Sequence, residues 1–193
     1  MNKIYLLIIC FVLLTPVAKA QKVAVKTNLL YGAYTFTPNL GMEIDLGHRS
    51  TLDVNAGYNP WNLKGSEADN KKLVHWLANI EYRYWLCQTF KGHFFGAHIL
   101  GSQYNISQKE LPLLLGKESK DYRYDGWAAG VGISYGYQFL LGRHLNLETS
   151  IGAGYAYLKY DKYNCYKCGE KVGNSSRNYF GPTKAAVSLI YIF

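Results

Sequence analysis

Several features that mark other protein classes are scarce or missing in this sequence. Only 18% of its 193 residues are charged, below the roughly 25% of an ordinary soluble domain. No apolar run reaches the roughly 18 residues that a membrane-spanning helix needs, which excludes a helical membrane protein. Proline occurs 5 times, whereas aromatic residues make up 16% and tyrosine alone occurs 18 times. Because disordered chains combine few aromatics with much charge, this composition excludes disorder.

Cysteine is also rare, and one pair has the spacing of a site. Cys165 and Cys168 form a C-x-x-C, but a structural zinc site usually takes two such pairs. The βαβ setting of a redox motif is missing. In an oxidising compartment we expect a local disulfide between the two, with free thiols as the alternative. Cys87 would then be an unpaired thiol, and we expect no metal and no cofactor.

Basic residues exceed acidic ones, 21 against 13, but they do not cluster and no helical DNA-reading motif is visible. Dispersed surface charge explains this excess better than a nucleic-acid partner does.

The first twenty residues have the three-part layout of a secretory signal peptide. A short positive start at Met1–Lys3 precedes the mostly apolar run Ile4–Val17, and Ala18 and Ala20 provide the small residues of a cleavage site. The run is too short to serve as a membrane anchor. We therefore expect export, with residues 1–20 removed and residues 21–193 forming one domain.

The mature chain alternates between apolar and polar or small residues in eight segments, the signal for strands with two unlike faces. They are residues 22–31, 40–47, 51–58, 75–84, 93–104, 126–139, 145–157 and 183–193. The connections 47–50, 87–92 and 142–144 are short, whereas 59–73, 105–123 and 161–178 are long and polar, and all three fall at one end. The sequence predicts an all-β fold, an eight-stranded antiparallel up-and-down transmembrane β-barrel. The short first turn, around Pro38, is the exception.

The composition of the two faces favours a barrel in lipid over a soluble sandwich. The less apolar face is dominated by Gly, Ala, Ser and Asn, which fit the narrow interior of an eight-stranded barrel. Tyrosine and tryptophan gather near strand ends, as in the aromatic girdles of membrane barrels. A bilayer also requires closure, because an open edge would leave backbone groups unpaired in hydrocarbon.

The last strand places apolar side chains on one face up to the end of the chain. Val187, Leu189, Tyr191 and Phe193 share that face. This pattern resembles the C-terminal signal read by the machinery that inserts outer-membrane barrels, so we expect that machinery and outer-membrane lipid among the partners.

Four segments carry a family resemblance over the whole mature chain. Residues 26–31, 37–41, 57–62 and 179–184 read KTNLLY, TPNLG, GYNPWN and YFGPTK. They resemble a family of uncharacterised Gram-negative outer-membrane proteins that is catalogued as a domain of unknown function. Its architecture is similar to small barrels of the OmpA and OmpX type. Members often lie near genes for fimbrial assembly, which implies a cell-surface role and a cell-surface protein as partner. The family implies no activity and no site residues.

Charged residues of both signs fall on the predicted inner face. We expect them to form a polar network that fills the lumen, because buried charge is tolerated only when it is paired. The residues are Lys26, Glu43, Asp53, Glu81, Arg83, Glu148 and Lys184. Paired carboxylates also suit acid–base catalysis, but a substrate could hardly reach them inside so narrow a barrel.

Three functions follow from this pattern. The first is a non-enzymatic outer-membrane protein with a structural or surface-interaction role, carried by the polar loops 65–72, 108–121 and 162–178. The second is a narrow channel for small solutes, gated by the charged residues. The third is a lipid-modifying enzyme, for which His98 and Ser102 would have to face lipid from one strand.

Overall fold

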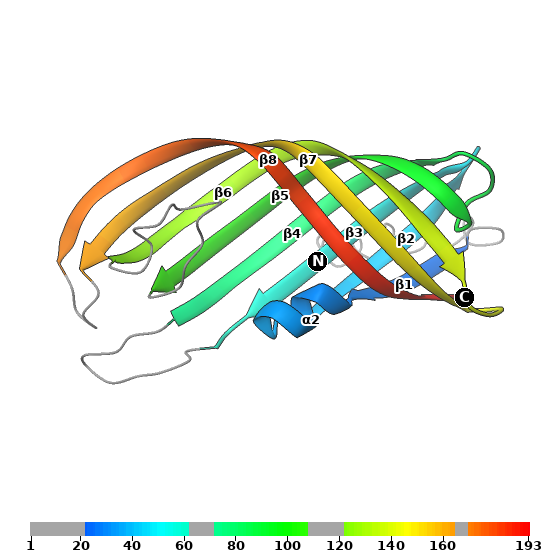
Figure 1. Ribbon diagram of the computed structural model, residues 1–193, viewed down its shortest axis with the longest axis horizontal. Coiled ribbons are helices and arrows are strands. Elements are labelled where there is room, and N and C mark those ends of the chain that lie inside the picture. The colour runs from blue at the N-terminus through cyan, green and yellow to red at the C-terminus, as the bar shows by residue number, and fades with distance from the viewer. Residues whose placement is uncertain (1–21, 62–71, 108–121, 165–169) are drawn as a thin grey trace, which may run out of the picture.

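The computed structural model describes residues 22–61, 72–107, 122–164 and 170–193. Eight antiparallel strands follow one another around a closed ring, and β1 pairs with β8 to close it (Figure 1). The strands are β1 (Val23–Asn28), β2 (Asn39–Gly47), β3 (Ser50–Asn59), β4 (Lys72–Trp85), β5 (Gly92–Ser107), β6 (Tyr122–Leu140), β7 (Leu145–Asn164) and β8 (Lys171–Ile192). The predicted all-β, up-and-down arrangement is confirmed. Residues 1–20, the predicted signal peptide, lie outside the described residues.

The two ends of the ring differ. At the turn end, connections of residues 48–49, 86–91 and 141–144 join β2 to β3, β4 to β5 and β6 to β7. At the opposite end, which we call the α2 end, helix α2 (Leu29–Thr35) joins β1 to β2. Strand length rises from 6 residues in β1 to 22 in β8. As a result, β7 and β8 extend well past α2 (Figure 1).

Helix α2 corrects the prediction that the first strand continues to Tyr31. The strand ends at Asn28, whose side chain accepts a hydrogen bond from the Leu30 amide at 3.1 Å and caps the helix. Alternation over Leu29–Tyr31 is too short to tell a strand from the first turn of a helix. Within the described ranges, no helix is long and apolar enough to cross a membrane.

The predicted polar loop 162–178 is wrong over most of its length. Residues 162–164 belong to β7, and residues 171–178 pair with β7 as the first part of β8. Both faces of this part of β8 are mostly exposed, so apolar alternation is not required there and its polar sequence resembles a loop. Of the other two predicted loops, 65–72 and 108–121, every residue but Lys72 lies outside the described residues, and Lys72 is the first residue of β4.

The two faces of the ring have the predicted composition. In β6, the inner positions from Gly126 to Gly136 are small residues, namely Gly, Ala and Ser. The residues that alternate with them face outward. On the outer face, large apolar side chains are exposed. In β4 and β6, exposed aliphatic side chains lie between one exposed aromatic residue toward each end of the strand. We call this surface the outer belt; it includes Val54, Trp76, Ile80, Tyr84, Phe95, Ile99, Trp127, Val131, Ile133, Tyr135 and Ile151.

Candidate functional site

The seven charged residues predicted for the lumen lie together inside the ring. Six strands provide them: Lys26 on β1, Glu43 on β2, Asp53 on β3, Glu81 and Arg83 on β4, Glu148 on β7 and Lys184 on β8. Successive side chains of a strand point to opposite faces, and each of these seven occupies a position that faces the inside of the ring. The side chain of Lys184 is 10% exposed, and none of the other six exceeds 2%.

Arg83 is the centre of this charged network. Its Nη1 lies 2.8 Å from both Glu43 Oε2 and Glu148 Oε2, and its Nη2 lies 2.7 Å from Asp53 Oδ2. Its Nε donates to Glu81 Oε2 at 2.9 Å. One guanidinium therefore contacts four carboxylates, which uses the fixed fork of its donors fully.

The two lysines complete the network. Lys26 Nζ pairs with Glu43 and lies 3.2 Å from Asp53 Oδ1 and 3.4 Å from Glu148 Oε2. Lys184 Nζ pairs with Glu81, which also accepts from the Ser134 hydroxyl. Four carboxylates and three cationic groups leave one negative charge without a counter-ion among these seven residues.

Aromatic rings close the lumen below the network, toward the turn end. Trp85 and Phe94 are fully buried and their ring centroids are 4.8 Å apart. The Phe90 ring centroid lies 6.0 Å from that of Trp85. The Arg83 guanidinium carbon lies 4.4 Å from the Phe94 ring centroid, so the charged layer and this aromatic layer are in direct contact.

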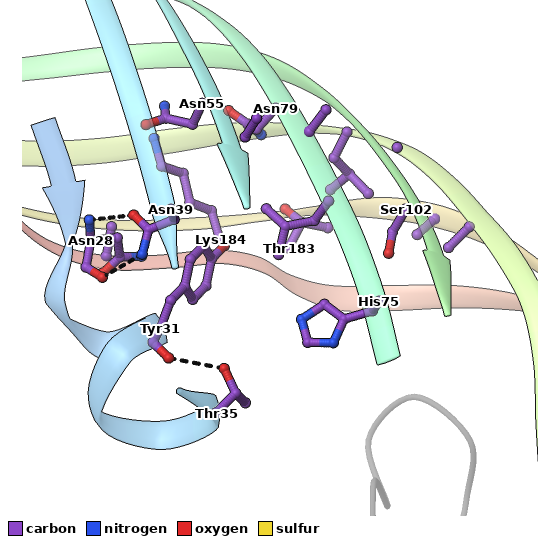
Figure 2. A pocket seen from close by; sticks show the side chains of 18 of the residues that line it. Asn28, Tyr31, Thr35, Asn39, Asn55, His75, Asn79, Ser102, Thr183 and Lys184 are labelled. Carbon is purple, nitrogen blue, oxygen red and sulfur yellow. Dashed lines mark hydrogen bonds between the residues drawn. The ribbon is translucent and has the colours of Figure 1, made fainter. Parts of the chain in front are cut away.

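Above the network, toward the α2 end, the ring encloses a cavity of about 340 Å³. Figure 2 looks into it, with Asn28, Tyr31 and Asn39 on one side and His75 and Ser102 on another. Burial raises the pKa of the Tyr31 hydroxyl, so this group on α2 stays protonated. Apolar side chains form most of the wall, among them Leu77, Leu100, Ala128, Ala156, Leu158 and Ala186.

Sequence reasoning did not single out this cavity. The inward positions of Leu77 and Leu100 interrupt a predominantly small or polar inner face, and this is the signal that the sequence offered. The cavity itself is lined by small alanines on the neighbouring strands β6, β7 and β8 and by residues of the other strands, a combination that alternation within one strand does not reveal.

His98 and Ser102, the pair considered for lipid chemistry, face the interior. His98 is 3% exposed, and its Nε2 lies 2.9 Å from Thr183 Oγ1. Thr183 reaches the interior through an irregularity in the β7–β8 register, although its predicted register points outward. Ser102 lines the cavity. In the described part of the chain, no cluster of His, Cys, Asp or Glu has the arrangement of a metal site.

The remaining predicted residues lie near the chain's end or outside the described part. Val187, Leu189, Tyr191 and Phe193 alternate with the buried Ala186, Ser188 and Ile190, and Tyr191 and Phe193 are exposed. Cys165 and Cys168 lie outside the described residues. Cys87 is exposed in the connection between β4 and β5.

The chain was compared with protein families, curated proteins and solved structures. A family model described as "Protein of unknown function (DUF3575)" matches residues 6–193. No curated protein and no solved structure shows significant similarity to the chain.

Proposed function

The chain belongs to the DUF3575 family of proteins of unknown function, and from its fold and interior we propose that it is a non-enzymatic outer-membrane β-barrel with a structural or surface-interaction role. The match over residues 6–193 confirms the predicted membership of a family catalogued as a domain of unknown function. The proposal includes export by a signal peptide at residues 1–20, insertion by the barrel-insertion machinery, and contact with outer-membrane lipid and a cell-surface protein.

The outer belt carries this proposal. Ile133 is 74% exposed and Ile151 is 64% exposed on the outside of the ring, and a water-soluble domain rarely exposes a continuous apolar surface. In β4 the belt runs over nine residues from Trp76 to Tyr84, and in β6 over nine from Trp127 to Tyr135. A strand that crosses a bilayer at a tilt needs about 9–11 residues.

Ring closure supports the same environment. The backbone ladder between β1 and β8 leaves the belt without a free edge at the turn end, and hydrocarbon tolerates only structures whose backbone groups are paired internally. The long ends of β6, β7 and β8 then extend beyond the membrane on the α2 side. Such an extension is where surface contacts are made in barrels of this kind.

The packed lumen supports a role other than conduction. A solute would have to pass the charged network around Arg83 and the layer formed by Trp85, Phe90 and Phe94. Apart from Lys184, which is 10% exposed, all these side chains are 3% exposed or less. The inward position of His98 and Ser102 removes the pair on which lipid modification would have depended.

Gel mobility of the folded protein tests the membrane proposal. Protein extracted from the membrane fraction should resist SDS when unheated and change its mobility after boiling, because a closed ladder unfolds only on heating. Recovery of the protein from the buffer-soluble fraction, folded without detergent, would overturn the proposal.

Planar-bilayer conductance separates the non-conducting role from the channel. We expect no stable openings from the protein as it exists, nor from the variant Leu77→Ala, which enlarges the cavity but leaves the charged network intact. Openings that disappear in Glu81→Gln or Arg83→Gln would instead favour a gated pore.

Comparison of lipid A from cells with and without the gene tests the lipid-modifying enzyme. We expect the two lipid A samples to be the same, because the proposed role is non-enzymatic.

A further inference from the structure

The cavity at the α2 end combines an apolar wall with a floor whose charges are already paired. We propose that this cavity binds an uncharged, mainly apolar small molecule that carries one hydrogen-bonding oxygen. This inference goes beyond the proposed function, because it rests on the interior of the ring and not on the environment of the outer belt.

A charged ligand would find no free counter-charge in the cavity. Three cations and two carboxylates line it, namely Lys26, Arg83, Lys184, Asp53 and Glu148. Asp53 and Glu148 both pair with Arg83. The two lysines pair with the carboxylates of Glu43 and Glu81, which belong to the same charged network. An ion that entered would therefore lose its hydration without gaining a free partner, and an uncharged molecule has no such cost.

The balance of charge gives no preference for one sign either. The groups that line the cavity have one cation in excess, whereas the whole network has four carboxylates against three cations. These two excesses are opposite in sign and lie within the same layer. The floor therefore favours neither an anion nor a cation.

Apolar side chains from four neighbouring strands, β4 to β7, make up much of the wall. They include Leu73, Leu77, Leu100, Ile106, Ala128 and Leu158. Leu73, Ile106 and Leu158 also pack together in one buried cluster, so this wall is formed before a ligand arrives. A ligand that covers the wall removes apolar surface from water, which is the main favourable contribution to binding.

One hydroxyl on the α2 side offers the ligand a polar contact. Tyr31 lies on α2 and lines the cavity, and its side chain extends from the helix toward the middle of the cavity (Figure 2). Its backbone carbonyl accepts hydrogen bonds from the Thr35 hydroxyl and the Thr37 amide, but its own hydroxyl has no hydrogen-bond partner among the described residues. A protonated tyrosine hydroxyl can donate to an oxygen of the ligand.

The volume of the cavity limits the ligand to a small one. About 340 Å³ lies at the lower end of the range of small-molecule sites, which are typically apolar with a few placed polar groups. A benzene ring with a short chain that ends in a ketone combines this size with an apolar body and one hydrogen-bonding oxygen. A molecule of this kind is therefore a suitable probe.

Equilibrium dialysis with three probes of the same shape tests the preference for an uncharged ligand. The probes are 4-phenylbutan-2-one, the anion 3-phenylpropanoate and 4-phenylbutan-2-amine, which is a cation at neutral pH. The full mature chain lies in one compartment and its variant Ala128→Trp, which fills the cavity from the inner face of β6, in the other. Both are in the same detergent, so uptake of the probe by micelles cancels.

We expect the ketone to accumulate with the parent protein and to bind it at least tenfold more tightly than either ion. Equal or tighter binding of the anion or the cation would overturn the proposal. An equal distribution of the ketone between the two compartments would overturn it as well, because the cavity would then bind no such molecule.

Two further variants locate the bound molecule. Tyr31→Phe removes the hydroxyl and should weaken binding of the ketone about threefold to tenfold, the usual effect of one hydrogen bond. Binding of the hydrocarbon 3-methylbutylbenzene, which has the same shape and no oxygen, should not change. Ala129→Trp places the large side chain on the outer face of β6 and should bind the ketone as the parent does. Unchanged ketone binding in Tyr31→Phe would contradict the assigned polar contact.

Mobility on an unheated SDS gel verifies that each variant is folded, so a loss of binding is read only from folded protein. If Ala128→Trp does not fold, Leu100→Trp replaces it, because Leu100 faces the same cavity from β5. Because binding is measured in detergent, these outcomes do not depend on whether the protein is found in the outer membrane.

Discussion

At the scale of single residues, Arg83 does most to hold the interior together. Its guanidinium contacts carboxylates from β2, β3, β4 and β7, and so connects strands that are not neighbours in the ring. Removing one partner of a buried ion network leaves charge without compensation, which costs much more than the net contribution of the intact network.

Replacing Arg83 with alanine should therefore be severely destabilising. We expect Arg83→Ala to lower the free energy of unfolding by about 3–5 kcal/mol, because four carboxylates lose their shared partner. Urea titration of the protein folded in detergent measures this change. The matched control is Lys159→Ala, at an exposed position on β7, which should stay within about 0.5 kcal/mol of the parent. Equal unfolding midpoints for both variants would contradict a central role for Arg83.

At the scale of elements, strand identity was predictable and strand ends were not. The inner placement of Glu43, Asp53 and Glu81 follows from period-two alternation, because one shared register puts every second side chain in the lumen. The first part of β8 was missed because its sequence is polar on both faces. Helix α2 was missed because capping by Asn28 outweighs the alternation that continues into Leu29.

Helix α2 should depend on the side chain that caps it. Asn28 accepts from the Leu30 amide and also contacts β8, donating to the Ala185 carbonyl at 3.2 Å. We expect Asn28→Ala to destabilise α2 by about 1 kcal/mol and to speed amide hydrogen exchange over residues 29–35. Exchange in β4 and β5 should stay as in the parent. Asn28→Ser retains a capping oxygen and should recover most of the protection; uniform loss of protection across the ring would argue against a local role.

At the scale of the whole molecule, an apolar exterior surrounds an interior that contains a layer of buried charges, whereas a soluble domain places its charges outside. The alternation, the small inner residues and the outward aromatics together predicted this arrangement. The cavity could not be predicted, since side chains from all eight strands line it and these come together only when the ring is closed. The same holds for Thr183, whose inward position depends on a register irregularity.

Fluorescence quenching can test the proposed contact between the outer belt and lipid. The four native tryptophans can be replaced with phenylalanine and single ones restored or added. In vesicles of brominated lipid, we expect Val131→Trp, at the middle of the belt in β6, to be quenched best by bromine deep in the acyl chains. Trp127, at the edge of the belt, should be quenched best by bromine near the head groups. Ala128→Trp faces inward and should be quenched by neither, and quenching of all three alike would contradict the assigned faces.

The ladder between β1 and β8 has a consequence for how the protein is made. It joins only Ala24–Asn28 to Ser188–Ile192, with one more bond from the Phe193 amide to the Val23 carbonyl. The two paired segments are far apart in the sequence, so this pairing cannot form until residues 188–192 have been synthesised. Until then the edge strands present unpaired backbone N–H and C=O groups that can pair with another polypeptide. Deletion of residues 188–193 would remove the residues that pair with β1 and leave an open sheet.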